Sequence, residues 1–150
     1  MAFLYRKNMY GPTPQFEEDI AAGTISKGDL IAKNGSSLGM IRCVAITEDI
    51  RGVAAHDAVT DDDLLYYPWL PGLVFEVPVE GTTYVDATHK NTAVDLYDGD
   101  SVIDSVQPGA VTYKTVYLLG MADGEVASAT TKVLVTPKYA FKCNDLDVST

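Results

Sequence analysis

The sequence predicts an all-β protein, either a small β-barrel or a β-sandwich, with an extended N-terminal arm and one short helical turn. Short runs rich in β-branched and aromatic residues follow one another along the chain. Turn signals built from Gly, Asp, Asn and Pro separate these runs, as at residues 27–29, 34–35 and 98–100. Several runs also alternate apolar and polar side chains with a period of two, which is typical of strands.

The alternation is clearest at residues 73–79. Leu73, Phe75 and Val77 fall on one face of an extended chain, whereas Glu76 and Pro78 fall on the other. Residues 111–121 are apolar on both sides over their second half, which predicts a central or covered strand.

The same criteria locate the other strands. We expect strands at residues 29–33, 39–47, 52–55, 73–79, 93–97, 111–121 and 130–136, and a final extended stretch at residues 138–143. Short strands at such regular spacing indicate a barrel or a sandwich.

Residues 1–15 are expected to form the extended arm, and residues 16–150 a single β-rich domain. Bulky side chains occur at Phe3, Leu4, Tyr5, Met9 and Tyr10, and a Gly-Pro-Thr-Pro break follows them. The alternative is a frayed terminus, or a first strand that packs into its own core.

The helical turn is predicted after Thr60. This residue can act as the N-cap, the acids at residues 61–63 suit the positive end of a helix dipole, and Pro68 ends the turn. The expected helix is one or two turns long.

The amino-acid composition of the chain limits the classes of partner that it can bind. The chain has 150 residues and a formal charge of −10, so one domain is expected, and phosphate-rich nucleic acid is a poor partner. The charge is uneven, because residues 1–15 carry Arg6 and Lys7 and no acid. We find neither a secretory signal nor an apolar run long enough to span a membrane, and therefore expect no membrane partner.

Catalytic groups do not converge in the sequence. His56 and His89 are the only side chains that ordinarily titrate near neutral pH, and they lie in separate segments. His56 and Asp57 could form a base and its orienting acid, but adjacent residues on an extended chain point to opposite faces. We therefore predict no catalytic residue, no small-molecule substrate and no enzymatic activity.

Metal and cofactor sites are also not expected. Asp95, Asp98 and Asp100, or the acids at residues 61–63, could bind calcium, but their spacing differs from an EF-hand and favours solvated turns. No glycine-rich nucleotide motif occurs. Cys43 and Cys143 are expected to be reduced, partly buried thiols, with a disulfide between them as the alternative.

One aromatic cluster could form a binding surface. Tyr66, Tyr67 and Trp69 lie next to Pro68 and shortly before Pro71, and could present a sugar platform or a protein interface. Local packing of the same rings onto the core is the alternative.

The segment from Ala21 to Val79 resembles the head decoration, or cement, proteins of tailed bacteriophages. The resemblance lies in Gly28-Asp29-Leu30-Ile31, in the apolar strand that begins at Gly39, in the segment from Gly52 to Ala58, and in Pro71 to Pro78. It covers about half of the chain, and the C-terminal half is similar only in containing further strands.

The resemblance implies a structural virion protein that is made in the host cytoplasm. Such a protein docks on the outer surface of an expanded capsid, contacts the major capsid protein, and stabilises the mature head, commonly as a homotrimer, although other homo-oligomers are possible. A receptor- or glycan-binding β-sandwich module is the alternative function.

The candidate capsid-binding residues lie in the arm, which could add a strand to the sheet edge of a neighbouring subunit. They are Phe3, Leu4, Tyr5, Arg6, Lys7 and Tyr10.

Overall fold

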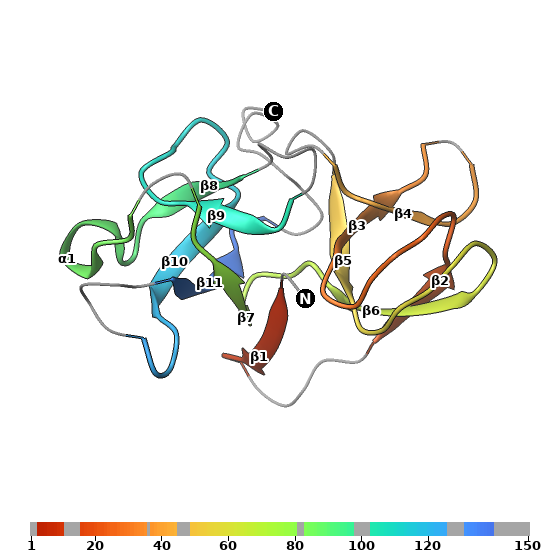
Figure 1. The fold of residues 1–150 in the computed structure, drawn as a ribbon, viewed down its shortest axis with the longest axis horizontal. Coiled ribbons are helices and arrows are strands. Elements are labelled where there is room, and N and C mark those ends of the chain that lie inside the picture. The colour runs from red at the N-terminus through yellow and green to blue at the C-terminus, as the bar shows by residue number, and fades with distance from the viewer. Residues whose placement is uncertain are drawn as a thin grey trace.

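The computed structural model is nearly all β and describes residues 3–10, 16–35, 37–44, 49–80, 83–97, 103–125 and 131–139. Its strands form two antiparallel sheets that occupy opposite halves of the molecule, with β1 and β7 near the middle (Figure 1). Over the described residues neither sheet closes into a barrel, and the arrangement is sandwich-like. The all-β fold class is therefore confirmed.

The first sheet has six strands. Its order is β1 (Leu4–Asn8), β7 (Leu73–Pro78), β11 (Lys132–Pro137), β10 (Val116–Met121), β8 (Ala93–Tyr97) and β9 (Ser105–Gln107). Strand β10 is paired on both sides, as the doubly apolar sequence predicts.

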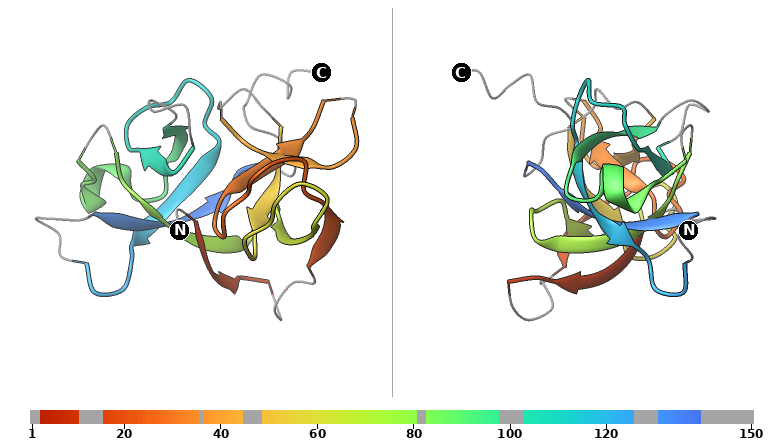
Figure 2. Two further views of the ribbon diagram at one scale, coloured as in Figure 1. Left: turned by 45° about the vertical axis from the view of Figure 1, so that its right-hand side comes forward. Right: turned by 90° about the vertical axis from the view of Figure 1, so that its left-hand side faces the viewer.

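The second sheet has five strands. Its order is β2 (Glu17–Ile20), β6 (Asp63–Pro68), β5 (Ile50–Ala54), β3 (Leu30–Lys33) and β4 (Met40–Arg42). Figure 2 shows this sheet beside the six-stranded one after rotation of the molecule.

The main core is shared by both sheets. Phe75 and Val77 of β7 contribute from the first sheet, and Leu30 of β3 and Val53 of β5 contribute from the second. Trp69, in the link between β6 and β7, is fully buried in the same cluster. Because one apolar core joins residues from both sheets, the two sheets belong to one packed body.

The five-stranded sheet also curls around a second, smaller core. Beyond β2, Ala21 bridges Met40 of β4, and the Ala22 amide donates to the Met40 carbonyl at 2.8 Å. Gly39 has a φ of +92°, and a Cβ there would lie 2.8 Å from the Ile20 carbonyl oxygen. Glycine is therefore required where the two ends of the sheet approach.

The predicted helical turn after Thr60 is wrong. Asp61 adopts a φ of +72°, and Asp62 closes a turn by accepting the Val59 amide at 3.0 Å. The next residues form strand β6, in which Leu64 and Tyr66 are buried on one face. The acids thus form a turn rather than a helix N-terminus.

The described helix lies elsewhere, at α1 (Asp86–His89), at the far end of the six-stranded sheet (Figure 1). Its four residues are too few to span a membrane.

Every expected strand segment contains an observed strand, but the segments 39–47 and 111–121 are much longer in the prediction. Residues 111–115 precede β10, Cys43 and Val44 follow β4, and residues 45–48 lie outside the described residues. In the expected stretch at 138–143, Lys138 and Tyr139 form a bend, and residues 140–143 are not described.

Candidate functional site

The N-terminal segment is extended, but it forms part of its own sheet. Strand β1 pairs antiparallel with β7, with Tyr5 opposite Phe75. Phe3 is 1% exposed, and its ring packs edge-on against Trp69 and Phe75 with centroids 6.2 and 6.5 Å apart. Residues 3–8 therefore follow the alternative expectation, a first strand packed into its own core. Residues 11–15 lie outside the part of the chain that the structure describes.

The two N-terminal cations have different surroundings. Arg6 Nη2 donates to Glu76 Oε1 at 3.0 Å, and Glu76 is only 7% exposed. This ion pair ties β1 to β7 and compensates a buried carboxylate. Lys7 is exposed on the same strand.

Two other N-terminal candidate residues, Leu4 and Tyr5, are half-buried. Tyr5 stacks on Tyr67 of β6 with ring centroids 4.4 Å apart, and the Phe16 ring lies 4.8 Å from the Tyr67 ring. Burial, followed by the nearby Tyr67 phenol, raises the pKa of Tyr5. These rings join the two sheets.

The predicted surface at Tyr66, Tyr67 and Trp69 is wrong for two of its members. Trp69 is 0% exposed and stacks on Phe75 with centroids 5.9 Å apart. Tyr66 is 8% exposed and belongs to the second core. Neither ring can serve as a sugar platform, because such a ring must present an open face to the sugar and both of these rings are buried. The alternative, packing onto the core, describes these residues.

An apolar groove lies just beyond β1, where Tyr10 is 79% exposed. Its volume is about 250 Å³. We call it the Tyr10 groove, and its lining residues are Met9, Tyr10, Pro71, Gly72, Asn91, Tyr117, Leu119, Thr136, Pro137 and Lys138.

Two hydrogen bonds of Gly72 hold the wall of the Tyr10 groove next to β1. The Met9 amide donates to the Gly72 carbonyl at 2.8 Å, and the Gly72 amide donates to Thr136 Oγ1 at 2.8 Å. Gly72 has a φ of +98°, and a Cβ there would lie 2.4 Å from the ring of Tyr10. The aromatic ring therefore rests directly on the backbone of Gly72.

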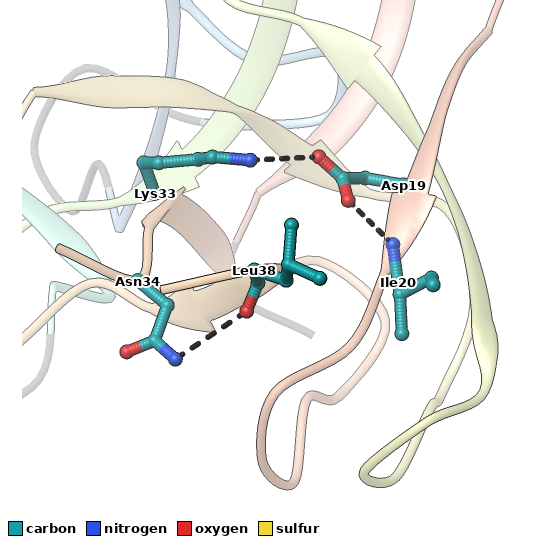
Figure 3. A network of polar contacts seen from close by, with 5 residues as sticks. All are labelled: Asp19, Ile20, Lys33, Asn34 and Leu38. Carbon is teal, nitrogen blue, oxygen red and sulfur yellow. Dashed lines mark hydrogen bonds and ion pairs between the residues drawn. The ribbon is translucent and has the colours of Figure 1, made fainter. Parts of the chain in front are cut away.

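A second hollow, the charged pocket, opens at one side of the curled sheet. Its volume is about 330 Å³, and its lining residues are Glu17, Asp19, Lys33, Met40, Arg51 and Tyr66. Figure 3 shows Lys33 extending from β3 to Asp19 on β2, with Lys33 Nζ 3.4 Å from Asp19 Oδ2. Asp19 Oδ1 also accepts the Ile20 amide at 2.7 Å (Figure 3).

Acidic and basic side chains both line the charged pocket, and their charges partly offset one another. Burial raises the pKa of Tyr66, and the carboxylates of Glu17 and Asp19 raise it further, while Arg51 acts in the opposite direction. The cross-strand pair of Lys33 and Asp19 links the edge strand β2 to β3. These contacts give the pocket a structural role in joining strands.

Both histidines make hydrogen bonds to the backbone. His56 Nε2 accepts the Leu65 amide at 3.0 Å, and its Nδ1 lies 2.8 Å from the Asp57 carbonyl oxygen. His89 Nδ1 accepts the Val85 amide at 2.8 Å at the start of α1. The neutral imidazoles therefore satisfy backbone groups in two separate parts of the fold.

Asp95 organises a loop. It is 5% exposed, and its carboxylate accepts the amides of Thr112, Tyr113 and Lys114 at 3.2, 2.7 and 2.7 Å. Asp98 and Asp100 lie outside the described residues. Among the residues that the structure describes, no His, Cys, Asp or Glu side chains gather as three or more potential metal ligands.

The structure describes one of the two cysteines. Cys43 is buried in the main core, and Cys143 is not among the described residues.

No protein-family model matches the chain, and no curated protein matches it.

Sequence reasoning identified Tyr10 but missed the rest of the Tyr10 groove. Gly72, Tyr117 and Lys138 come from three separate segments, and only their pairing in the six-stranded sheet brings them together. One local signal was available in Tyr117, a large aromatic residue that alternates with the buried Val116 and Leu118.

Proposed function

We propose that this chain is a structural virion protein of the decoration type, which docks on the outer surface of a tailed-phage capsid and stabilises the mature head. The observation that carries the proposal is the position of β1 at the edge of the six-stranded sheet. This strand has five residues, carries the exposed Lys7, and leads directly to the exposed Met9 and Tyr10. Among the described strands, β1 is also the outermost one of its sheet.

The other sheet edges are less suited to a partner. Strands β4 and β9 have only three residues each. Strand β2 has four residues, and three of them are the acids Glu17 to Asp19, whereas one of the two cations of the five-residue β1 is already paired with Glu76. Charge therefore discourages strand addition more at β2 than at β1. An incoming strand from a capsid subunit therefore finds its best edge at β1.

The resemblance to decoration proteins supports the same function. Three of the resembling segments form strands β3, β5 and β7, which supply residues to the main core. In this proposal they build the rigid body, and the edge beyond them makes the contact.

The position of Phe3 changes the expected mechanism. A buried Phe3 anchors β1 to its own body, so the strand presents its open edge to the capsid instead of leaving to join a neighbour. A homotrimer that contacts several subunits of the major capsid protein would convert weak single contacts into avid binding. Docking sites that span several subunits have the correct spacing only on the expanded shell, which gates binding to maturation.

Co-sedimentation with purified capsids tests the proposal. Wild-type protein is expected to pellet with expanded shells, to bind unexpanded shells poorly, and to raise the temperature at which expanded shells rupture. Absence of wild-type protein from expanded shells would overturn the proposed function.

A charge-reversal pair locates the contact. Lys7→Glu on β1 should reduce occupancy several-fold, because the exposed cation lies on the docking edge. Lys27→Glu is the matched control, since it makes the same change in net charge at an exposed position on the five-stranded half. Equal losses in the two variants would exclude β1 as the specific contact.

A further inference from the structure

The turn that joins β3 to β4 contains an asparagine followed by a glycine, Asn34-Gly35. An asparagine carboxamide can be attacked by the backbone nitrogen of the next residue, and a glycine leaves that nitrogen least hindered because it has no Cβ. The other three asparagines of the chain precede Met9, Thr92 and Asp145, which all carry side chains. Asn34 is therefore the asparagine at which this attack is sterically easiest.

The side chain of Asn34 is held weakly in the turn. Its Nδ2 donates to the Leu38 carbonyl at 3.5 Å, which is long for a hydrogen bond (Figure 3). Asn34 is half-buried, whereas Gly35 and Leu38 are exposed. Little therefore prevents the carboxamide from turning toward the backbone, and water can reach it.

The backbone nitrogen of Gly35 is also accessible. Gly35 has a φ of +54°, and a Cβ added there would meet no atom within 4 Å. Its amide donates to the Lys33 carbonyl at 2.9 Å, a bond that spans only two residues and can open locally. By contrast, the Met9 amide that follows Asn8 donates to the Gly72 carbonyl at 2.8 Å and joins two distant segments.

We propose that Asn34 is a site of spontaneous deamidation. The deprotonated Gly35 nitrogen bonds to Asn34 Cγ, the Cγ–Nδ2 bond breaks, and Nδ2 leaves as ammonia after taking up a proton. One water molecule then opens the cyclic imide. Cleavage at Cγ gives aspartate, and cleavage at the main-chain carbonyl gives isoaspartate, in which the backbone gains one methylene. The inference goes beyond the proposed function and does not depend on it.

Isoaspartate in this turn would disturb the second core, because the turn fixes the position of β4. The Asn34 amide donates to the Gly39 carbonyl at 3.1 Å, and Lys33 lies opposite Met40. Gly39 has no room to move toward β2, since even an added Cβ would lie 2.8 Å from the Ile20 carbonyl oxygen. A longer backbone therefore displaces β4, and Met40, which is 3% exposed, leaves its place in the second core.

Incubation of the folded, full-length protein in mildly alkaline buffer tests the reaction, because the attacking nitrogen must lose its proton. Digestion at acidic pH and mass spectrometry then measure the conversion of amide to acid at each asparagine. We expect conversion at Asn34 to be several-fold faster than at Asn8 and Asn91 in the same sample. Equal or slower conversion at Asn34 would overturn the inference.

Substitutions in the turn assign the reaction to the two residues. Gly35→Ala places a methyl group beside the attacking nitrogen, in open space, and should slow conversion at Asn34 several-fold. Asn34→Gln keeps a carboxamide but requires a larger ring, and should show no conversion at this position. Gly124→Ala is the matched control, because Gly124 also has a positive φ and open space around it, and it should convert Asn34 at the wild-type rate. Circular dichroism checks that each variant is folded. A wild-type rate in folded Gly35→Ala would contradict the proposed attack.

Amide exchange tests the structural consequence. The Ala22 amide donates to the Met40 carbonyl, so its exchange rate reports on the position of β4. In the isoaspartate form, isolated by chromatography, this amide should exchange several-fold faster than in fresh protein. The Leu118 amide, which donates to the Thr92 carbonyl in the six-stranded half, is the control and should not change. Unchanged exchange at Ala22 would refute the displacement of β4.

Discussion

At the scale of single residues, polar side chains in this protein mainly order its backbone. Asp95, His56 and His89 were the sequence's best candidates for metal binding or catalysis, and each bonds to main-chain groups. The residue types could be identified from the sequence, but their partners could not. The amides that Asp95 accepts lie 17 to 19 positions away, and no local pattern reveals such a contact.

Asp95→Ala should destabilise the fold strongly. The change removes a buried acceptor and leaves the amides of Tyr113 and Lys114 without it, at a cost of about 3 kcal/mol. Urea unfolding measures the loss, and the exposed turn residue Asp123, changed to Ala, is the control. An equal effect of the two substitutions would contradict the role assigned to Asp95.

Tyr84 should make stability fall at alkaline pH. Burial raises its pKa, and the hydrogen bond that its hydroxyl donates to Asp86 Oδ1 at 2.8 Å raises it further. Because the pKa of Tyr84 is raised in the folded state, the stability that its protonated hydroxyl contributes is complete below the unfolded pKa near 10. This stability is lost as the pH rises above that value. Above about pH 10, the free energy of unfolding should fall less steeply with pH for Tyr84→Phe than for wild type. Parallel curves would refute this linkage.

At the scale of elements, the alternation of apolar and polar side chains predicted strands well. The capping signal at Thr60, by contrast, predicted a helical turn where the structure has a turn and strand β6. Residues 93–97 form β8 as expected, and residues 73–78 form β7. The capping pattern at Thr60 failed because a helix of one or two turns has little stability of its own. The same residues gain a full set of strand partners as β6, between β2 and β5.

Strand β1 was predicted as extended, but its pairing could not be read from the sequence. An isolated apolar strand with two cations fits either a partner's sheet or its own. The choice depends on β7, which offers Phe75 opposite Tyr5 and Glu76 beside Arg6. Both partners lie about seventy positions along the chain.

Truncation of β1 should therefore destabilise the protein. Phe3→Ala is expected to cost about 3–5 kcal/mol, because it empties a buried site beside the stacked rings of Trp69 and Phe75. Leu4→Ala, at a half-buried position of the same strand, should cost less. Thermal or urea unfolding gives both values. A deletion of residues 1–8 that retained wild-type stability would contradict the anchoring of β1.

At the scale of the whole molecule, the shared core couples the edge strand β1 to the five-stranded sheet. Strand β1 packs through Phe3 on Trp69, and the backbone amide of Trp69 donates to the Arg51 carbonyl of β5 at 2.9 Å. The five-stranded sheet thus supports the junction at which β1 begins. Such support would keep the β1 edge in a fixed orientation, which the proposed multivalent docking requires.

The two sheets should unfold together. Trp69 is the chain's single tryptophan and is fully buried in the shared core, so its fluorescence reports on the junction between the sheets. In urea, the fluorescence transition should coincide with the loss of β-sheet circular dichroism.

Substitution at the shared core provides a sharper test of this coupling. Val53→Ala on β5 should cost about 2 kcal/mol and lower amide-exchange protection in β8 and β10 as well as in its own sheet. The exposed control Leu38→Ala should change protection in neither sheet. A Val53→Ala effect confined to the five-stranded sheet would mean that the two sheets are separate folding units. The junction at Trp69 would then be a contact between two units and could not hold the β1 edge rigid.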